Sequence, residues 1–133
     1  MNDLMLFARA FSDPTRIRIL SALCGGELCV CELVDALELG QSTLSTHLQV
    51  VRQAGLVATT KRGKWIYYSL EPEQAGNVKM LLSLYKAALE ADRRLQRDAE
   101  RLAQRLCLRE DGCCVVGLIA AGCEKPSVQG KRK

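Results

Sequence analysis

The fold of this chain is decided by residues 41–70, which read QSTLSTHLQVVRQAGLVATTKRGKWIYYSL. Leu44 and Leu48 stand one helical turn apart between polar residues, so the first part predicts a helix over residues 41–54 that Gly55 ends. After Gly55 the spacing of the apolar residues changes from the helical repeat to every second residue. Residues 56–60 and 65–70 are rich in β-branched and aromatic side chains, and the basic, glycine-containing link between them predicts a β-hairpin with a basic tip.

Three further helices are predicted upstream of this stretch. Apolar residues recur at helical spacing over residues 4–11, and a second helix begins with Asp13 as N-cap and Pro14 in its first turn. A short third helix over residues 29–37 is separated from the helix at 41–54 by Gly40. Two short helices joined by a glycine-containing turn, followed by a basic hairpin, have the order of a winged helix-turn-helix. The predicted fold class is therefore mainly α with a β-hairpin wing.

Downstream of the hairpin, apolar residues continue at helical intervals over residues 72–106. One helix of this length would span roughly 50 Å, and its exposed apolar stripe predicts a second copy of the chain as partner. Arginines repeat along it every fourth residue, and we interpret them as a solvated outer face rather than a nucleic-acid contact: Arg93, Arg97, Arg101, Arg105 and Arg109. We divide the chain into a DNA-binding and dimerisation domain at 1–108 and a cysteine-containing basic tail at 109–133.

The composition is that of one globular domain. The chain has 133 residues, of which 48% are hydrophobic and 26% charged, and this balance excludes collagen-like and disordered classes. Its longest uncharged apolar stretch, residues 115–122, is too short to span a bilayer, and the first residues lack the apolar run of a secretory signal. We therefore expect a cytoplasmic protein without a membrane partner. No nucleophile, base and orienting group are recognisable together, so we expect no enzyme activity.

The net charge of +4 is concentrated around the predicted hairpin. Residues 40–70 contain four of the 19 basic residues and none of the 15 acidic ones, so the charges of the other residues balance. A segment without carboxylates favours a polyanionic partner, although a solvated basic loop would explain the charge alone. The lack of carboxylates and the polar start of the helix at 41–54 together indicate that the partner is double-stranded DNA. The candidate DNA-contacting residues are Gln41, Ser42, Thr43, Ser45, Thr46, His47, Arg52, Arg62 and Lys64.

The chain has seven cysteines and one histidine, which excludes zinc sites built on paired histidines. In a reducing compartment such cysteines are buried hydrophobes, reactive thiols or soft-metal ligands. Cys29 and Cys31 stand at the predicted start of the third helix, where the helix terminus lowers a thiol pKa and favours binding of arsenite, antimonite, cadmium, lead or cuprous ion. Residues two apart in a regular helix point about 200° away from each other, so a shared ion requires a distorted or frayed first turn.

These motifs resemble the ArsR/SmtB family of metalloregulatory repressors. The resemblance covers roughly residues 4–90 and is carried by residues 10–16 (AFSDPTR), 27–33 (ELCVCEL), 41–57 and 62–70. It implies a homodimeric winged helix, dimerised through its first and last helices, that represses a resistance operon until a metal ion releases it from operator DNA. The zinc site of the family uses histidines and carboxylates of the last helix, and no histidine stands there in this sequence.

The arsenic-responsive branch of the family places a third cysteine three residues after the Cys-x-Cys pair, where this chain has Val34. A three-sulfur site therefore needs another donor, for which Cys107, Cys113 and Cys114 are the candidates, ahead of Cys24 and Cys123. The expected function is a repressor released by As(III), with Sb(III) as a second inducer. The alternatives are a Cd(II)- or Pb(II)-responsive or a thiol-oxidation-responsive repressor of the same fold. A small thiol oxidoreductase would need Cys-x-x-Cys and a βαβ pattern, which the sequence lacks.

Overall fold

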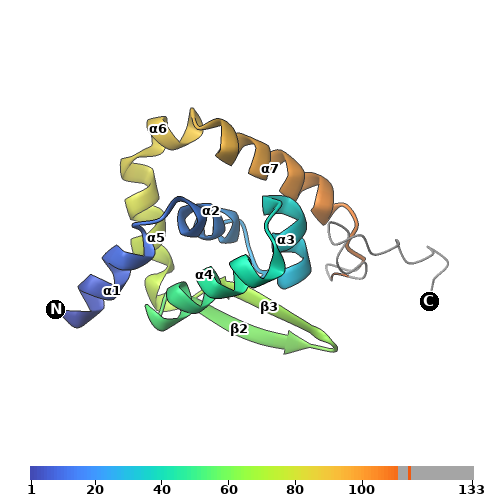
Figure 1. The fold of residues 1–133 in the computed structure, drawn as a ribbon, viewed down its shortest axis with the longest axis horizontal. Coiled ribbons are helices and arrows are strands. Elements are labelled where there is room, and N and C mark those ends of the chain that lie inside the picture. Colours follow the sequence, from blue (N-terminus) through green and yellow to red (C-terminus); the bar gives the residue numbers. More distant parts are fainter. Residues whose placement is uncertain (111–113, 115–133) are drawn as a thin grey trace.

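The computed structural model describes residues 1–110 and Cys114. Figure 1 shows a mostly helical domain with a protruding hairpin, and this architecture confirms the predicted fold class. Within the described residues, none of the helices combines the length and apolarity that a membrane span requires. The elements in chain order are α1 (Asn2–Ala10), α2 (Pro14–Leu23), β1 (Leu28–Cys29), α3 (Val30–Leu37), α4 (Gln41–Gln53), β2 (Val57–Arg62), β3 (Trp65–Leu70), α5 (Pro72–Leu84), α6 (Lys86–Glu90) and α7 (Arg93–Leu106).

Local signals place the helix-turn-helix where the sequence predicts it. The Asp13 carboxylate accepts the backbone N–H groups of Thr15 and Arg16 at 2.8 and 3.3 Å, which caps α2. Gly55 follows α4 with a φ of 75°, a conformation that glycine adopts without steric cost. Leu44 and Leu48, the two predicted anchors of α4, are 0% and 2% exposed and belong to the core formed with α2 and α3. The polar face of α4 is thereby turned outward.

The wing is a three-stranded antiparallel sheet rather than an isolated hairpin. β2 and β3 pair from Val57 opposite Leu70 to Arg62 opposite Trp65, as predicted. The other edge of β3 pairs with β1, whose Cys29 stands opposite Tyr67. The third helix, predicted from about residue 29 to residue 37, is confirmed as α3, with Cys29 as its N-cap and the backbone of Cys29 paired in the sheet. This pairing joins the cysteine motif to the wing.

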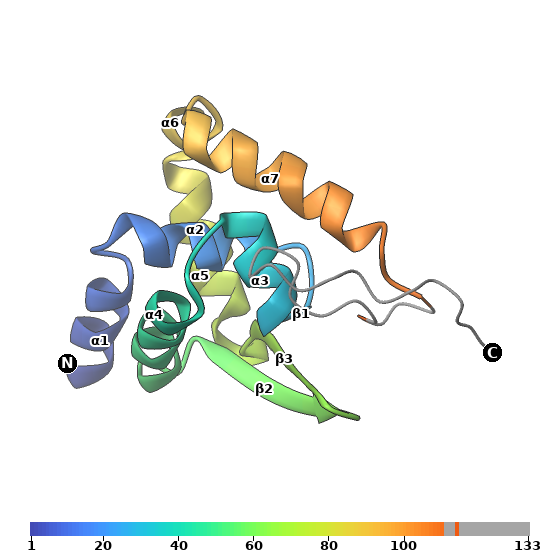
Figure 2. The ribbon, with the colours of Figure 1, turned by 45° about the vertical axis from the view of Figure 1, so that its right-hand side comes forward.

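The single helix predicted over residues 72–106 is wrong, since the chain forms α5, α6 and α7 there. Tyr85 breaks the first helix with φ −113° and ψ 24°. Asp92 starts the last one, and its carboxylate accepts the N–H of Leu95 at 3.0 Å. Figure 2 shows α7 running back across the domain, and it packs against α2 and α3. An Asp N-cap inside an otherwise helical pattern was the signal that the prediction of one long helix overlooked.

Some of the arginines at residues 93–109 depart from the prediction of a solvated face. Arg93 and Arg97 are exposed, but Arg105 is only 4% exposed and its Nε lies 2.7 Å from Oδ2 of Asp35 in α3. Arg101 donates to the backbone oxygen of Asp35 at 2.8 Å. The buried carboxylates of α3 explain the difference, because a buried charge requires a partner of opposite sign.

Candidate metal centre

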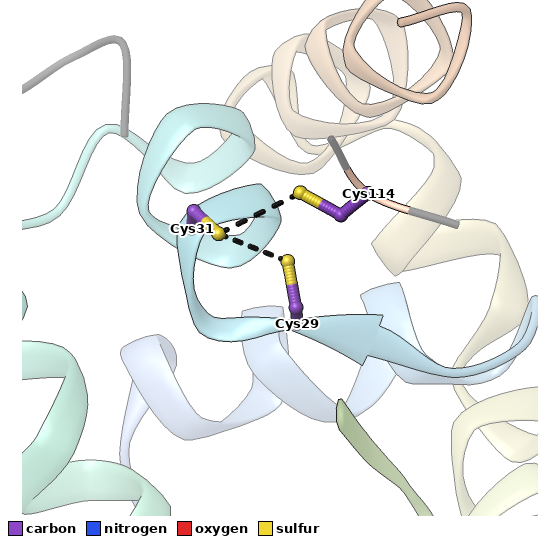
Figure 3. Close-up of side chains that lie close together, drawn as sticks. All are labelled: Cys29, Cys31 and Cys114. Carbon is purple, nitrogen blue, oxygen red and sulfur yellow. Dashed lines mark hydrogen bonds between the residues drawn. The ribbon is translucent and has the colours of Figure 1, made fainter. Parts of the chain in front are cut away.

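Three thiols from distant parts of the chain meet where β1, α3 and the segment after α7 come together (Figure 3). Sγ of Cys31 lies 3.0 Å from Sγ of Cys29 and 3.7 Å from Sγ of Cys114. All three sulfur atoms lie within 4.8 Å of one another. Cys29, Cys31 and Cys114 are 1%, 4% and 1% exposed, so the cluster is shielded from bulk water. We call these three residues the trithiol cluster.

The backbone at Cys29 explains how two thiols two residues apart can converge. Cys29 is the N-cap of α3 and has φ −83° and ψ 166°, so it is extended, whereas Cys31 lies in the first helical turn. The expectation of a distorted or frayed first turn agrees with this backbone, because Cys29 stands before the first helical turn in an extended conformation. The change from strand to helix between the two residues replaces the helical rotation that would separate their side chains.

A buried carboxylate and an arginine support the start of α3. Glu32 is fully buried, and its Oε1 accepts the backbone N–H of Cys29 at 3.0 Å in a capping-box arrangement. Arg109 holds this carboxylate with two bonds of 2.6 and 2.7 Å and also donates to the backbone oxygen of Glu27 at 2.8 Å. The residues after α7 thus brace the loop that carries Cys29. Sequence reasoning missed Glu32 and Arg109, although the Glu three residues after the N-cap is a capping-box signal.

Cys114 is the candidate third donor that the structure brings to Cys29 and Cys31. Its backbone N–H donates to Oη of Tyr67 at 2.7 Å, and Nη2 of Arg105 lies 3.6 Å from its Sγ.

The other candidate donors lie elsewhere. Cys107 at the end of α7 is exposed, and its thiol donates to the backbone oxygen of Ala103 at 3.3 Å. Cys24 is half-buried against the core. Cys113 and Cys123 lie outside the described residues.

The cluster raises the pKa of Cys29 and Cys31, so these two thiols are protonated at neutral pH. The interaction with Cys114, the interaction with Cys31 and burial all raise the pKa of Cys29. Hydrogen bonding to Cys114 is the largest cause that raises the pKa of Cys31, to about 11. The expected lowering of the thiol pKa by the helix terminus is therefore wrong in this state, because shared protons and burial outweigh the helix dipole. A soft ion that binds here must displace protons.

The predicted DNA-contacting face of α4 is accessible. The exposed candidates on α4 and the wing are Gln41, Ser42, Thr43, Ser45, Thr46, Arg52, Arg62 and Lys64. His47 differs, because it is half-buried with Nδ1 3.1 Å from Nη1 of Arg16 and 3.9 Å from Oδ1 of Asp13. It thus connects α4 to the start of α2. Sequence reasoning did not identify Arg16 and Asp13 as its partners, because their contact crosses two helices.

The two wing cations rest on aromatic side chains. Lys64 lies 5.1 Å from the ring centroid of Trp65, and the Arg62 guanidinium lies 5.2 Å from that of Tyr67, both within the range of cation–π attraction. Arg62 also forms an ion pair with Glu27. The sheet thus orients the charged groups of Arg62 and Lys64. Glu27 lies upstream of the carboxylate-free residues 40–70, so the charge pattern of that segment did not predict its pairing with Arg62.

Comparison with known proteins identifies the family of this chain. Residues 13–59 match the family described as "Bacterial regulatory protein, arsR family". Over 98 residues the chain is 41% identical to the arsenic resistance transcriptional regulator ArsR1 of Pseudomonas putida, covering 72% of this chain and 74% of that protein. The chain belongs to the ArsR family. The resemblance predicted from the sequence is thereby confirmed, and the ArsR family is one of regulators rather than enzymes.

Two further comparisons concern a solved structure and a second relative. HlyU from Vibrio cholerae N16961 has a solved structure that aligns with a TM-score of 0.58 and 36% identity, over 63% of this chain and 92% of that chain. The cadmium resistance transcriptional regulatory protein CadC homolog of Staphylococcus aureus is 38% identical over 81 residues, covering 60% of this chain and 64% of that protein. Relatives named for arsenic and for cadmium therefore both match, and the choice of ion depends on the site itself.

Proposed function

We propose that this ArsR-family protein is a homodimeric transcriptional repressor that binds double-stranded operator DNA and releases it when As(III) is captured by Cys29, Cys31 and Cys114 of one subunit. Sb(III), which shares the three-coordinate chemistry, is a second inducer. The observation that carries the proposal is the set of three buried sulfur atoms within 4.8 Å of one another. We place the protein in the cytoplasm, where free thiols persist.

The chemistry of arsenous acid fits three neutral thiols. Each thiol replaces one hydroxyl of As(OH)3, so three As–S bonds form, three As–O bonds break and three waters leave with the thiol protons. Arsenic remains in the +3 state, and no oxidant is needed. A soft three-coordinate ion also suits thiolate ligands. The protonated state of Cys29 and Cys31 is thus compatible with capture of this ion.

The number of donors in the trithiol cluster favours a three-coordinate ion over a tetrahedral one. Sγ of Cys31 lies 3.0 Å from Sγ of Cys29 and 3.7 Å from Sγ of Cys114, so one ion can contact all three sulfurs after small side-chain shifts. In the described part of the chain, the cluster comprises these three ligands alone. Cadmium and lead sensors with four thiolates would need another donor.

The helix-turn-helix supplies the DNA contacts of the proposed repressor. The exposed polar residues at the start of α4 suit base edges in the major groove, and the basic wing suits flanking phosphates. Cys31 lies in α3, the first helix of the pair, so capture of an ion acts directly on the helix that supports α4. A coupling of about 1–3 kcal/mol, the usual allosteric scale, would weaken DNA binding roughly 5- to 150-fold.

A second copy of the chain suits the apolar surface of α1 and α5. Leu4, Met5, Met80 and Leu84 are 66%, 63%, 63% and 71% exposed. Leu4, Met80 and Leu84 also line a groove of about 660 Å³ between these two helices. A symmetric dimer would bury this surface and present two copies of α4 to a palindromic operator.

A band-shift titration of the full chain on its own promoter fragment tests the function. We expect arsenite to release the wild-type protein, and Cys29→Ser, Cys31→Ser and Cys114→Ser to abolish release while leaving DNA binding intact. Cys107→Ser is the matched control, because Cys107 is exposed and outside the cluster, and it should behave as wild type. Undiminished DNA binding of the wild type at saturating arsenite contradicts the proposal. Full release of Cys114→Ser would contradict the assignment of Cys114.

Oxidation of the cluster is a second candidate signal, favoured by the 3.7 Å separation of the Cys31 and Cys114 sulfurs. Hydrogen peroxide would oxidise the two thiols to one disulfide and be reduced to two waters. Release of DNA by peroxide without arsenite, reversed by a thiol reductant, would support this function. Release by arsenite under reducing conditions supports the proposed one.

A further inference from the structure

Tyr67 is a wing residue that the proposed DNA contacts do not use. It lies in β3 and is 1% exposed, next to the trithiol cluster. We propose that Tyr67 is the positioning residue that holds Cys114 against Cys29 and Cys31 and joins the thiol site to the wing. The role of the three sulfurs as ligands rests on the proposed function, whereas the contacts of Tyr67 do not.

Two of the three candidate sulfur donors depend on Tyr67. The backbone N–H of Cys114 donates to its hydroxyl at 2.7 Å. The backbone of Tyr67 stands opposite Cys29 in the β1–β3 ladder. A bond to the main chain of Cys114 fixes the point from which that thiol projects, and the ladder does the same for Cys29. One residue therefore sets the separation of two donors that stand 85 positions apart in the sequence.

The hydroxyl, rather than the ring, is the part that packing does not explain. A phenylalanine would bury the same aromatic surface beside Cys29 and Trp65. A buried hydroxyl is costly unless it is hydrogen-bonded, and here its bond goes to Cys114. Burial raises the pKa of Tyr67, so the hydroxyl stays neutral and accepts this bond as an uncharged group.

The ring of Tyr67 continues the connection toward DNA. Its centroid lies 5.2 Å from the guanidinium of Arg62, the exposed arginine at the end of β2. The guanidinium of Arg109, which holds Glu32 beside Cys29, lies 5.9 Å from the same centroid. A change in Cys114 that moves Tyr67 therefore reaches an arginine that we place at the flanking phosphates.

Tyr67→Phe tests the positioning role, with Tyr68→Phe on the same strand as the matched control. We expect Tyr67→Phe to weaken arsenite binding by the full chain about fivefold to tenfold, the scale of one buried hydrogen bond. Alkylation of Cys114 by iodoacetamide in the ligand-free protein, followed by peptide mass spectrometry, should become several-fold faster. Tyr68→Phe should change neither measurement by more than about twofold. DNA binding without arsenite should remain as in the wild type.

A double-mutant cycle separates positioning from general stability. In a Cys114→Ser background, Tyr67→Phe should cause no further loss of arsenite binding. An equal loss in both backgrounds, or wild-type behaviour of Tyr67→Phe in both measurements, overturns the proposal. If the wild type itself does not bind arsenite, the proposed function fails, while the alkylation rates still decide the role of Tyr67. Should Tyr67→Phe unfold, slow hydrogen exchange of the Cys114 amide in the wild type is required, and a rapidly exchanging amide overturns the inference.

Discussion

At the scale of single residues, the chemistry of the site depends on thiols that share protons. Hydrogen bonding to Cys114 holds the pKa of Cys31 at about 11, so the group is neutral across the physiological range. Arsenous acid is also neutral there, and its condensation with thiols releases water but no net protons. A divalent cation such as Cd²⁺ must instead expel a proton from each thiol that it binds.

This difference predicts a weak pH dependence for arsenite binding and a strong one for Cd²⁺ binding. Between about pH 6.5 and 8, below the raised pKa values of Cys29 and Cys31, arsenite affinity should change by less than about threefold. Cd²⁺ affinity should rise with pH, by about tenfold per unit for each proton released, because raising the pH removes the competing protons. Competition titrations at several pH values measure both slopes. A steep slope for arsenite would show that the thiols do not bind in their neutral form.

At the scale of elements, the return of α7 onto α3 is held by buried charge. Arg105 and Asp35 are 4% and 6% exposed and their Nε and Oδ2 atoms are 2.7 Å apart. Arg18 of α2 forms a second such pair with Asp98 of α7 at 2.7 Å. Since Arg105 also contacts Cys114, α7 is the element that connects the helix-turn-helix to the third sulfur.

Removal of one partner of the buried Arg105–Asp35 ion pair should lower the stability of the protein. Arg105→Met would leave the buried Asp35 carboxylate without its 2.7 Å ion pair and lower the free energy of unfolding by about 3–5 kcal/mol. The control is Lys86→Met, which removes an exposed pair with Glu90 at 3.9 Å and should cost less than about 1 kcal/mol. Urea denaturation followed by circular dichroism measures both. Equal, small losses would mean that α7 is not held by this pair.

At the scale of the whole molecule, the proposed function requires a second copy, and we place the contact at the exposed apolar surface of α1 and α5. Leu84 is 71% exposed and lines the groove between these helices. Leu84→Glu should produce monomers and weaken operator binding more than tenfold, because a lone subunit engages one half-site. Analytical ultracentrifugation and band shifts measure the two effects. Ile66→Glu, at a 47% exposed position in the wing, is the control for the oligomeric state. A dimeric Leu84→Glu would contradict this interface.

The amino-acid sequence by itself determined the helix-turn-helix, the wing and the first two thiols. Their signals are local: Asp13 caps α2, Leu44 and Leu48 repeat at one helical turn, Gly55 ends α4, and Cys29 and Cys31 are two residues apart. Propensity and periodicity act over a few neighbouring residues, so such features can be predicted without a partner element.

Only the tertiary structure decided which third thiol joins the pair and where the last helix lies. Cys114 stands 83 positions from Cys31, and their contact depends on the turn at Asp92, the buried pairing of Arg105 with Asp35 and the hydroxyl of Tyr67. The arginines of α7 and the residues after it have the spacing of a solvated face, but three of them are drawn inward by groups of α3, namely the backbone oxygen of Asp35 and the carboxylates of Asp35 and Glu32. Burial and charge compensation are properties of packed elements, which spacing along one segment does not encode.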